Sequence, residues 1–120
     1  MGSVLLVDDE PMVVEVLTTM LKSHGHEIVA LSDSAEAMRL IEQRCFDLFL
    51  FDLRMPDPSG ADLAEGVRQR WQNATVLIMT GFPDDPLAAR AMRSGVAALV
   101  KKPFEIGKIL AHLNSSDTRN

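Results

Sequence analysis

LFLFDLRMPDPSG, residues 48–60, is the stretch of sequence that decides the fold. It opens as an apolar run, which one acid, Asp52, closes, and continues with proline, aspartate, serine and glycine. A short apolar run followed by turn residues is typical of a strand that is buried on both faces, as in a parallel sheet. In such sheets ligands bind at the carboxyl ends of the strands, where we expect Asp52 to lie.

Similar apolar runs occur on both sides of this stretch, and each is too short for a typical helix. Together they predict strands at 4–7, 28–31, 46–51, 76–79 and 97–100. Between the runs, apolar residues recur with helical spacing, which predicts helices around 13–21, 38–45, 63–71, 87–92 and 106–113. This alternation predicts a three-layer α/β fold, a (βα)5 doubly wound parallel sheet that helices cover on both faces.

Residues at the helix ends agree with this pattern. Pro11 suits a first helical turn, and Gly25 and Gly95 suit C-terminal caps. Asp33 and Glu36 have the spacing of a capping box. These signals place the helix boundaries between the predicted strands.

The composition limits the class of protein. A chain of 120 residues with 47% hydrophobic residues suits one domain, expected at 1–114, followed by a polar tail or the start of a linker at 115–120. The apolar runs are shorter than the roughly 20 residues of a membrane span, and the start resembles no signal peptide, so we expect a cytoplasmic protein with no membrane association. A net charge of -5 disfavours nucleic acid binding and suits a cation site.

The cysteine and the histidines carry no expected chemistry. Cys45 closes the apolar stripe of the second helix, so we expect a buried thiol that packs as a small hydrophobe. His24, His26 and His112 fall at helix ends or at the edge of the sheet opposite Asp52. We expect them to face solvent.

Polar residues end four of the five predicted strands. They are Asp8 and Asp9, Asp52, Thr80, and Lys101 with Lys102. Each of them alone is explained as an ordinary cap, turn or strand residue. Three carboxylates at neighbouring strand ends are not explained in this way, because like charges that are brought together repel and raise one another's pKa.

A divalent cation would relieve that repulsion. Mg²⁺ uses one or two carboxylates and leaves room for phosphate oxygens, so we expect Mg²⁺ here, with Mn²⁺ as an alternative. One carboxylate of such a site can act as a nucleophile and form an aspartyl phosphate. Asp52 is the candidate, because it is the lone acid of the central strand. Lys102 and Thr80 would contact the phosphoryl oxygens, and the Thr80 contact would act as a switch.

The sequence resembles the receiver domains of two-component response regulators. The resemblance rests on VLLVDDEP at 4–11, LFLFDLRMPDPSG at 48–60, LIMTGFPDD at 77–85 and LVKKPF at 99–104. It implies a flavodoxin-like strand order of 2-1-3-4-5. It also implies a phosphorelay function, in which a sensor histidine kinase or a histidine phosphotransfer protein donates a phosphoryl group to the chain.

The resemblance assigns the metal site and the phosphoacceptor. Asp52 matches the phosphoacceptor and a metal ligand. Asp9 would bind Mg²⁺ directly, Asp8 would bind it mainly through water, and Arg54 would offer its backbone carbonyl.

The resemblance also assigns the switch and the site lysine. Thr80 matches the switch hydroxyl, and Lys102 matches the lysine, with a cis bond to Pro103. Lys101 is expected to point to the opposite face, because side chains alternate along a strand. Leu99 stands where the family usually has an aromatic switch residue, and we expect it to pack as an ordinary strand residue, with the alternative that signalling is damped or rerouted.

Two bulky residues flank the predicted site. Arg54 is two positions after Asp52, and Phe82 is two positions after Thr80. We expect both to shield the phosphoryl group from water and to lengthen its lifetime; in the alternative, both side chains lie in solvent. The family resemblance also implies an output surface on 87–92, 97–100 and 106–113, where an output domain or a second copy in a homodimer would dock.

Three other functions remain as alternatives. A phosphorylation-independent interaction module would not need the acids, Thr80 and Lys102. A flavodoxin-like cofactor protein requires a glycine- and hydroxyl-rich phosphate cradle after the first strand, where this chain has acids. A haloacid-dehalogenase type phosphatase places its acids differently. We expect enzymatic activity only as Mg²⁺-dependent self-phosphorylation and autodephosphorylation at Asp52.

Overall fold

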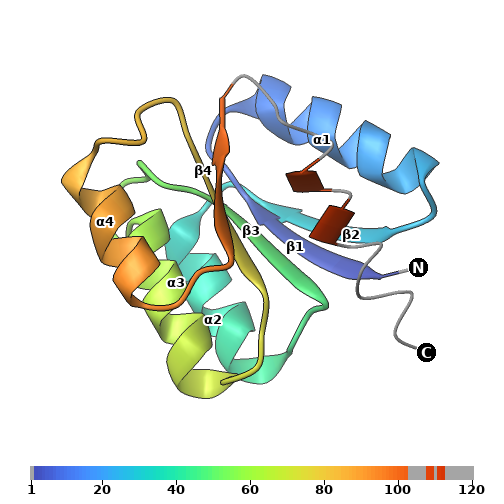
Figure 1. The fold of residues 1–120 in the computed structure, drawn as a ribbon. Helices are drawn as coiled ribbons and strands as arrows, with labels where there is room; N and C mark the ends of the chain where they lie inside the picture. The colour runs from blue at the N-terminus through green and yellow to red at the C-terminus, as the bar shows by residue number, and fades with distance from the viewer. Residues whose placement is uncertain (1, 103–107, 110, 113–120) are drawn as a thin grey trace.

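The computed structural model of the chain describes residues 2–102, 108–109 and 111–112. All neighbouring strands are parallel, in the order β2-β1-β3-β4-β5 (Figure 1). The strands are β1 Ser3–Val7, β2 Glu27–Leu31, β3 Leu48–Asp52, β4 Val76–Thr80 and β5 Ala98–Lys101, and the helices are α1 Pro11–Ser23, α2 Ser34–Gln43, α3 Gly60–Arg70 and α4 Pro86–Arg93. The predicted fold class and strand order are therefore confirmed.

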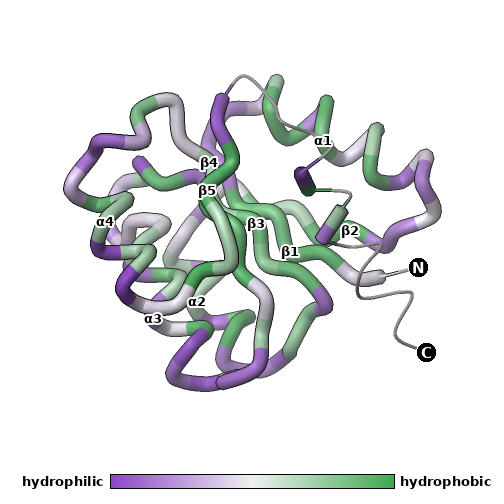
Figure 2. Tube along the Cα trace, in the orientation of Figure 1, coloured by the Kyte–Doolittle hydropathy of each residue, from purple (hydrophilic) through white to green (hydrophobic). Residues whose placement is uncertain are grey.

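Helices cover both faces of the sheet. α1 lies on one side, and α2, α3 and α4 lie on the other (Figure 1). Alternate residues of β1 point to opposite sides, so that Leu6 packs in the core under α1 and Leu5 in the core under α2 to α4. The apolar colour runs along the central strands, and the hydrophilic colour gathers in the loops and at helix ends around them (Figure 2). β3 and β4 are buried along their whole length, which explains why their sequences are continuous apolar runs.

The helix ends follow the predicted signals. Pro11 opens α1, and Asp33 caps α2 by accepting hydrogen bonds from the backbone amides of Ala35 and Glu36, which is the Asp33 half of the predicted capping box. Gly25 and Gly95, just past α1 and α4, have φ values of 86° and 98°, which favour glycine. A complete capping box occurs at the start of α3, where Ser59 and Asp62 cap each other's amides.

Several local predictions were wrong. Cys45 is exposed, because α2 ends at Gln43 and the thiol lies in the following loop. His26 is buried, and its Nδ1 accepts a hydrogen bond from the backbone amide of Gly2.

None of the helices in the described part of the chain has the length and apolar content to cross a membrane.

Much of the predicted fifth helix and the predicted cis bond before Pro103 fall on residues that the structure does not describe. Residues 108–109 and 111–112 are helical, and Ile109 is buried in the core under α1. The rest of 106–113 and the bond between Lys102 and Pro103 lie outside the described residues.

Candidate functional site

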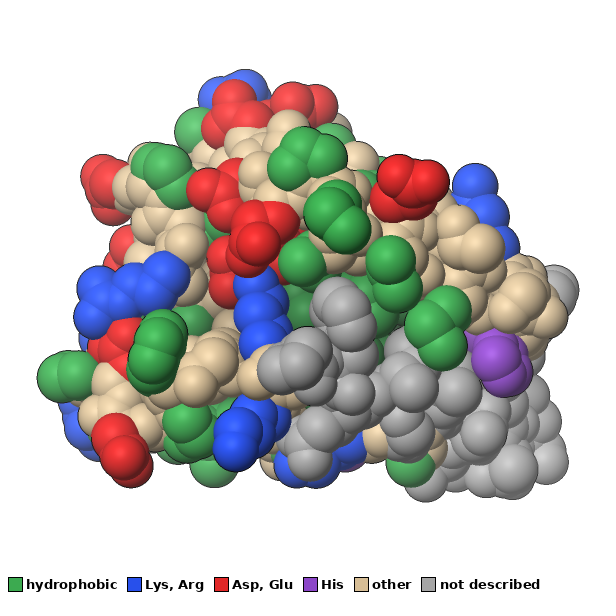
Figure 3. Space-filling model, turned by 90° about the horizontal axis from the view of Figure 1, so that it is seen from above, with side chains coloured by type: hydrophobic (Ala, Val, Ile, Leu, Met, Phe, Trp, Pro, Cys, Tyr) green, Lys and Arg blue, Asp and Glu red, His purple; other side chains and the backbone are tan. Residues whose placement is uncertain are grey.

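The strand ends bring the predicted residues to one edge of the sheet. Asp8 follows β1 directly, Asp52 ends β3, Thr80 ends β4 and Lys102 follows β5. The backbone holds them there, because the amide of Asp8 donates to the carbonyl of Leu31 and that of Lys102 donates to the carbonyl of Thr80. On the face seen from above, acidic side chains gather beside a basic one (Figure 3).

Lys102 is the centre of this cluster. Its Nζ lies 3.0 Å from Oδ1 of Asp52 and 3.1 Å from Oδ2 of Asp8. A third contact, also 3.1 Å, reaches Oε1 of Glu10. The side chain of Lys101, one residue earlier, is exposed. Of the two lysines, Lys102 is therefore the one that can contact a group bound at Asp52.

Burial and charge shift the pKa values of the two central acids. Burial, reinforced by the charge of Asp8, raises the pKa of Asp52 to about 6, although Lys102 opposes the shift. Burial also raises the pKa of Asp8. The pKa of Lys102 is raised, because its contacts with Asp52 and Asp8 outweigh the effect of burial. Lys102 therefore offsets only part of the negative charge that the acids bring to the site.

Carboxylate oxygens of Asp8, Glu10 and Asp52 lie within 4.8 Å of one another. Asp8 and Asp52 are buried, and Glu10 is exposed. Oxygen donors in a negatively charged cluster fit a hard cation such as Mg²⁺, which would neutralise the repulsion among them. Glu10 was missed in the sequence, although it is the third acid in the run that begins at Asp8. Asp9 is exposed and is not one of these three, but it lines the cavity beside them together with Glu10 and Asp52.

A cavity of about 240 Å³ opens beside the cluster. Its lining consists of Asp9, Glu10, Asp52, Arg54, Thr80, Gly81, Phe82 and Lys102. Thr80 is buried, and its hydroxyl oxygen accepts a hydrogen bond from the backbone amide of Phe82 at 2.9 Å. The Phe82 side chain is 76% exposed. The cavity thus places a hydroxyl, a lysine and the acids around a space large enough for a phosphoryl group.

Arg54 lines the cavity but is bound to another element. Its Nε lies 2.6 Å from Oδ2 of Asp85, and its NH2 group lies 2.6 Å from Oδ1. Asp85 also caps α4 by accepting a hydrogen bond from the amide of Leu87 at 2.9 Å. The hydrogen bonds from Arg54 hold the pKa of Asp85 below its usual value. Asp85 lies 31 residues from Arg54 in the sequence, so no local pattern predicts their contact.

A close turn fixes the position of Asp52. Gly60 opens α3, and its amide donates to the carbonyl of Leu53. A Cβ at Gly60 would lie 2.1 Å from the backbone oxygen of Asp52 and 2.8 Å from Cα of Leu53. The start of α3 therefore rests directly on the end of β3.

Leu99 is half-buried on β5. It packs against the apolar core that α4 helps to cover. In this structure Leu99 is thus an ordinary part of the sheet.

Asp52 makes stability depend on pH when no divalent cation is added. Its carboxyl has a pKa near 3.8 in the unfolded chain and about 6 in the folded protein, so the folded state binds more protons between these values. Stability contributed by Asp52 is therefore lost as pH rises through this window. We expect Asp52→Asn to raise the free energy of unfolding by about 1–3 kcal/mol at about pH 7, and by much less at about pH 4.

Urea unfolding of both proteins at the two pH values measures this difference. Asp84→Asn, which removes an exposed acid, is the charge-matched control and should show no comparable pH-dependent gain. An equal effect of Asp52→Asn at both pH values would contradict the raised pKa.

Sequence comparison with known proteins agrees with the fold described above. The sequence model described as the response regulator receiver domain matches residues 4–114. The transcriptional regulatory protein KdpE of Mycobacterium tuberculosis is 32% identical over 120 residues, which cover 100% of this chain and 53% of KdpE. The response regulator protein FleR of Pseudomonas aeruginosa is 36% identical over 109 residues, which cover 91% of this chain and 23% of FleR. The chain thus spans about half the length of KdpE and less of FleR.

Solved structures share the fold. A CheY-like response regulator receiver domain protein from Methanospirillum hungatei has a TM-score of 0.88 at 23% identity, with 100% of this chain and 99% of that chain covered. The receiver domain of a Pseudomonas aeruginosa sensor histidine kinase, which holds a magnesium ion in its active site cleft, has a TM-score of 0.84 at 23% identity. That alignment covers 95% of each chain.

Proposed function

The chain belongs to the response regulator receiver domain family, and on that basis we propose that it receives a phosphoryl group on Asp52. One observation carries the proposal: the carboxylate of Asp52 ends a buried central strand with Nζ of Lys102 at 3.0 Å. The cavity beside them has Thr80 on its wall. These are the groups that phosphoryl transfer to a carboxylate requires, namely a nucleophile and donors for the phosphoryl oxygens.

In the proposed reaction, an oxygen of Asp52 attacks the phosphorus of a phosphohistidine. The new O–P bond forms as the N–P bond to the donor breaks, and the histidine leaves with the bonding electron pair. Lys102 stays within reach of the phosphoryl oxygens and offsets their charge. The hydroxyl of Thr80, which accepts from the amide of Phe82 in this structure, is free to donate its own proton to the phosphoryl group.

Mg²⁺ is proposed as the cofactor. Asp8, Asp9, Asp52 and the backbone carbonyl of Arg54 would hold it, and the nearness of Glu10 to Asp8 and Asp52 makes Glu10 a further candidate ligand. When bound, the ion neutralises charge on the transferring phosphoryl group. Mn²⁺, another hard cation that oxygen ligands accept, is proposed as a substitute.

The partners are proposed from the same family membership. The donor is a sensor histidine kinase or a histidine phosphotransfer protein in the cytoplasm. The surface formed by α4, β5 and the helical residues after β5 would receive an output domain or a second copy of the chain. Direct binding of nucleic acid by this domain is not proposed, because the chain carries a net charge of -5.

Incubation with a small phosphodonor and Mg²⁺ tests the proposal. Intact mass should rise by one phosphoryl group in the wild type, only when the cation is present, and not at all in Asp52→Ala. No mass gain in the wild type, or an equal gain in the variant, would contradict the assignment. The first of these results would favour an interaction module that works without phosphorylation.

Phe82→Ala is expected to shorten the lifetime of the phosphorylated protein several-fold. Phe82 lines the cavity and is 76% exposed, so removal of its ring should let water reach the phosphoryl group more readily. Loss of the added mass after removal of the phosphodonor measures the decay. Met12→Ala truncates a side chain of similar exposure, 78%, that does not line the cavity, and should leave the decay unchanged. An unchanged decay of Phe82→Ala would remove Phe82 from the account.

A further inference from the structure

Arg54 joins two loops that leave the site. It lies two residues after Asp52, in the loop between β3 and α3, and its guanidinium makes a bidentate ion pair with Asp85 at the start of α4. Paired N–H donors that face both oxygens of a carboxylate form one of the stronger polar contacts in proteins. The pair therefore ties the loop of the phosphoacceptor to the first turn of α4.

The two partners differ in how firmly they are held. The Asp85 side chain is 8% exposed and also accepts the hydrogen bond from the Leu87 amide. The Arg54 side chain is 64% exposed. Arg54 is consequently the partner that can move, whereas Asp85 stays at the end of α4.

A phosphoryl group on Asp52 would compete for Arg54. Arg54 and Asp52 line the same cavity, so the new charge, about -1.5 to -2, would arise on the wall of a cavity that Arg54 also borders. The planar fork of arginine binds phosphate oxygens in the same bidentate way as it binds a carboxylate. Pairing with the phosphoryl group would thus replace the contact with Asp85 by one of higher charge.

We propose that the Arg54–Asp85 pair is a clamp on the first turn of α4 and that phosphorylation of Asp52 opens it by drawing Arg54 to the phosphoryl oxygens. The proposal rests on the proposed function and adds to it a route from the site to α4. Because binding couplings are reciprocal, weakening the clamp should in turn favour the phosphorylated state.

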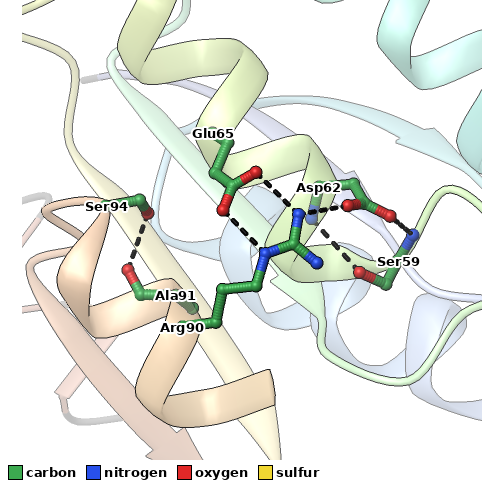
Figure 4. Close-up of polar contacts among 6 residues, drawn as sticks. All are labelled: Ser59, Asp62, Glu65, Arg90, Ala91 and Ser94. Atoms are coloured by element: carbon green, nitrogen blue, oxygen red, sulfur yellow. Dashed lines mark hydrogen bonds and ion pairs between the residues drawn. The ribbon is translucent and has the colours of Figure 1, made fainter. Parts of the chain in front are cut away.

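A second anchor limits how far the change spreads. Arg90, farther along α4, makes a bidentate pair with Glu65 of α3 at 2.6 and 2.7 Å (Figure 4). It also reaches Asp62, which is itself fixed by the capping box with Ser59. The middle of α4 therefore stays attached to α3 when the clamp opens. The change is confined to the first turn of α4 and the loop before it.

Asp85→Asn isolates the clamp. Asparagine is as good an N-cap as aspartate, so its side-chain oxygen keeps the bond from the Leu87 amide while the ion pair is lost. Under limiting phosphodonor and Mg²⁺, the ratio of phosphorylated to unphosphorylated protein should rise about two- to fivefold, the range expected for a partly exposed ion pair. Asp84→Asn removes the same charge one residue earlier and should leave the ratio unchanged.

A double-mutant cycle identifies Arg54 as the route. Adding Asp85→Asn to Arg54→Gln should not change the ratio further, because no guanidinium remains to be released. An equal rise in both backgrounds would overturn the clamp.

Hydrogen exchange supplies an independent readout. Phosphorylation of the wild type should speed exchange at the amides of Leu87 and Ala88, while the amides near Arg90 keep their protection. Unchanged exchange at Leu87 and Ala88 in protein whose mass shows phosphorylation would overturn the clamp and leave the phosphoacceptor assignment standing. No mass gain in the wild type would overturn both.

Discussion

Lys102→Ala is expected to slow phosphorylation of Asp52 by about 10²–10³-fold, the effect of removing one preorganised donor to a charged transition state. Nζ of Lys102 is 3.0 Å from Asp52 and in contact with Asp8 and Glu10, so no other described cation stands as close to the acids. Without it, the pKa of Asp52 should rise further, since Lys102 lowers it in the folded protein. The rate of mass gain with a small phosphodonor at saturating Mg²⁺ measures the effect.

Lys101→Ala is the matched control for this variant. It removes a lysine one residue earlier whose side chain is exposed. Its phosphorylation rate should stay close to that of the wild type. Similar rates for Lys102→Ala and Lys101→Ala would contradict the role assigned to Lys102.

Gly60→Ala is expected to destabilise the protein by about 3 kcal/mol or more, at or above the usual range for overpacking a closed core. The added Cβ would lie 2.1 Å from the backbone oxygen of Asp52, so β3 or α3 must move. Because both contacts are to backbone, no side-chain rotation relieves them. Urea unfolding measures the loss.

Gly81→Ala serves as the control. A Cβ there meets no heavy atom within 4 Å, although Gly81 lies at the same edge of the sheet. Its effect on the free energy of unfolding should stay within about 0.5 kcal/mol. Equal stabilities of the two variants would show that α3 can shift without cost.

The fold was predictable because its central strands, β1, β3 and β4, are buried on both faces. A run such as Leu48–Asp52 is almost continuously apolar, which is the pattern of a buried strand in a parallel sheet. The caps at Asp33 and Gly25 agree with helices that lie between such strands. A helix end that lacks a capping residue is not marked in the sequence in this way. The apolar stripe of α2 continued in sequence to Cys45, but the backbone leaves the helix after Gln43 and exposes the thiol.

The site was predictable where topology alone brings residues together. The carboxyl ends of β1, β3 and β4 meet at one edge, so the nearness of Asp8, Asp52 and Thr80 follows from the order of elements. Contacts made by long side chains do not follow from topology. Asp85 joins the site through a contact with Arg54 that no local sequence pattern encodes, and Glu10, although it continues the acidic run from Asp8, joins it through the path of its side chain.

The chemical location of the phosphoryl group tests the central claim most directly. Protein that has gained mass with phosphodonor and Mg²⁺ is treated with borohydride, which reduces an acyl phosphate to an alcohol and so converts a phosphorylated aspartate to homoserine. We predict homoserine at position 52, with all other acids unchanged. Homoserine at another aspartate, or an added phosphoryl group that borohydride leaves in place, would contradict the account.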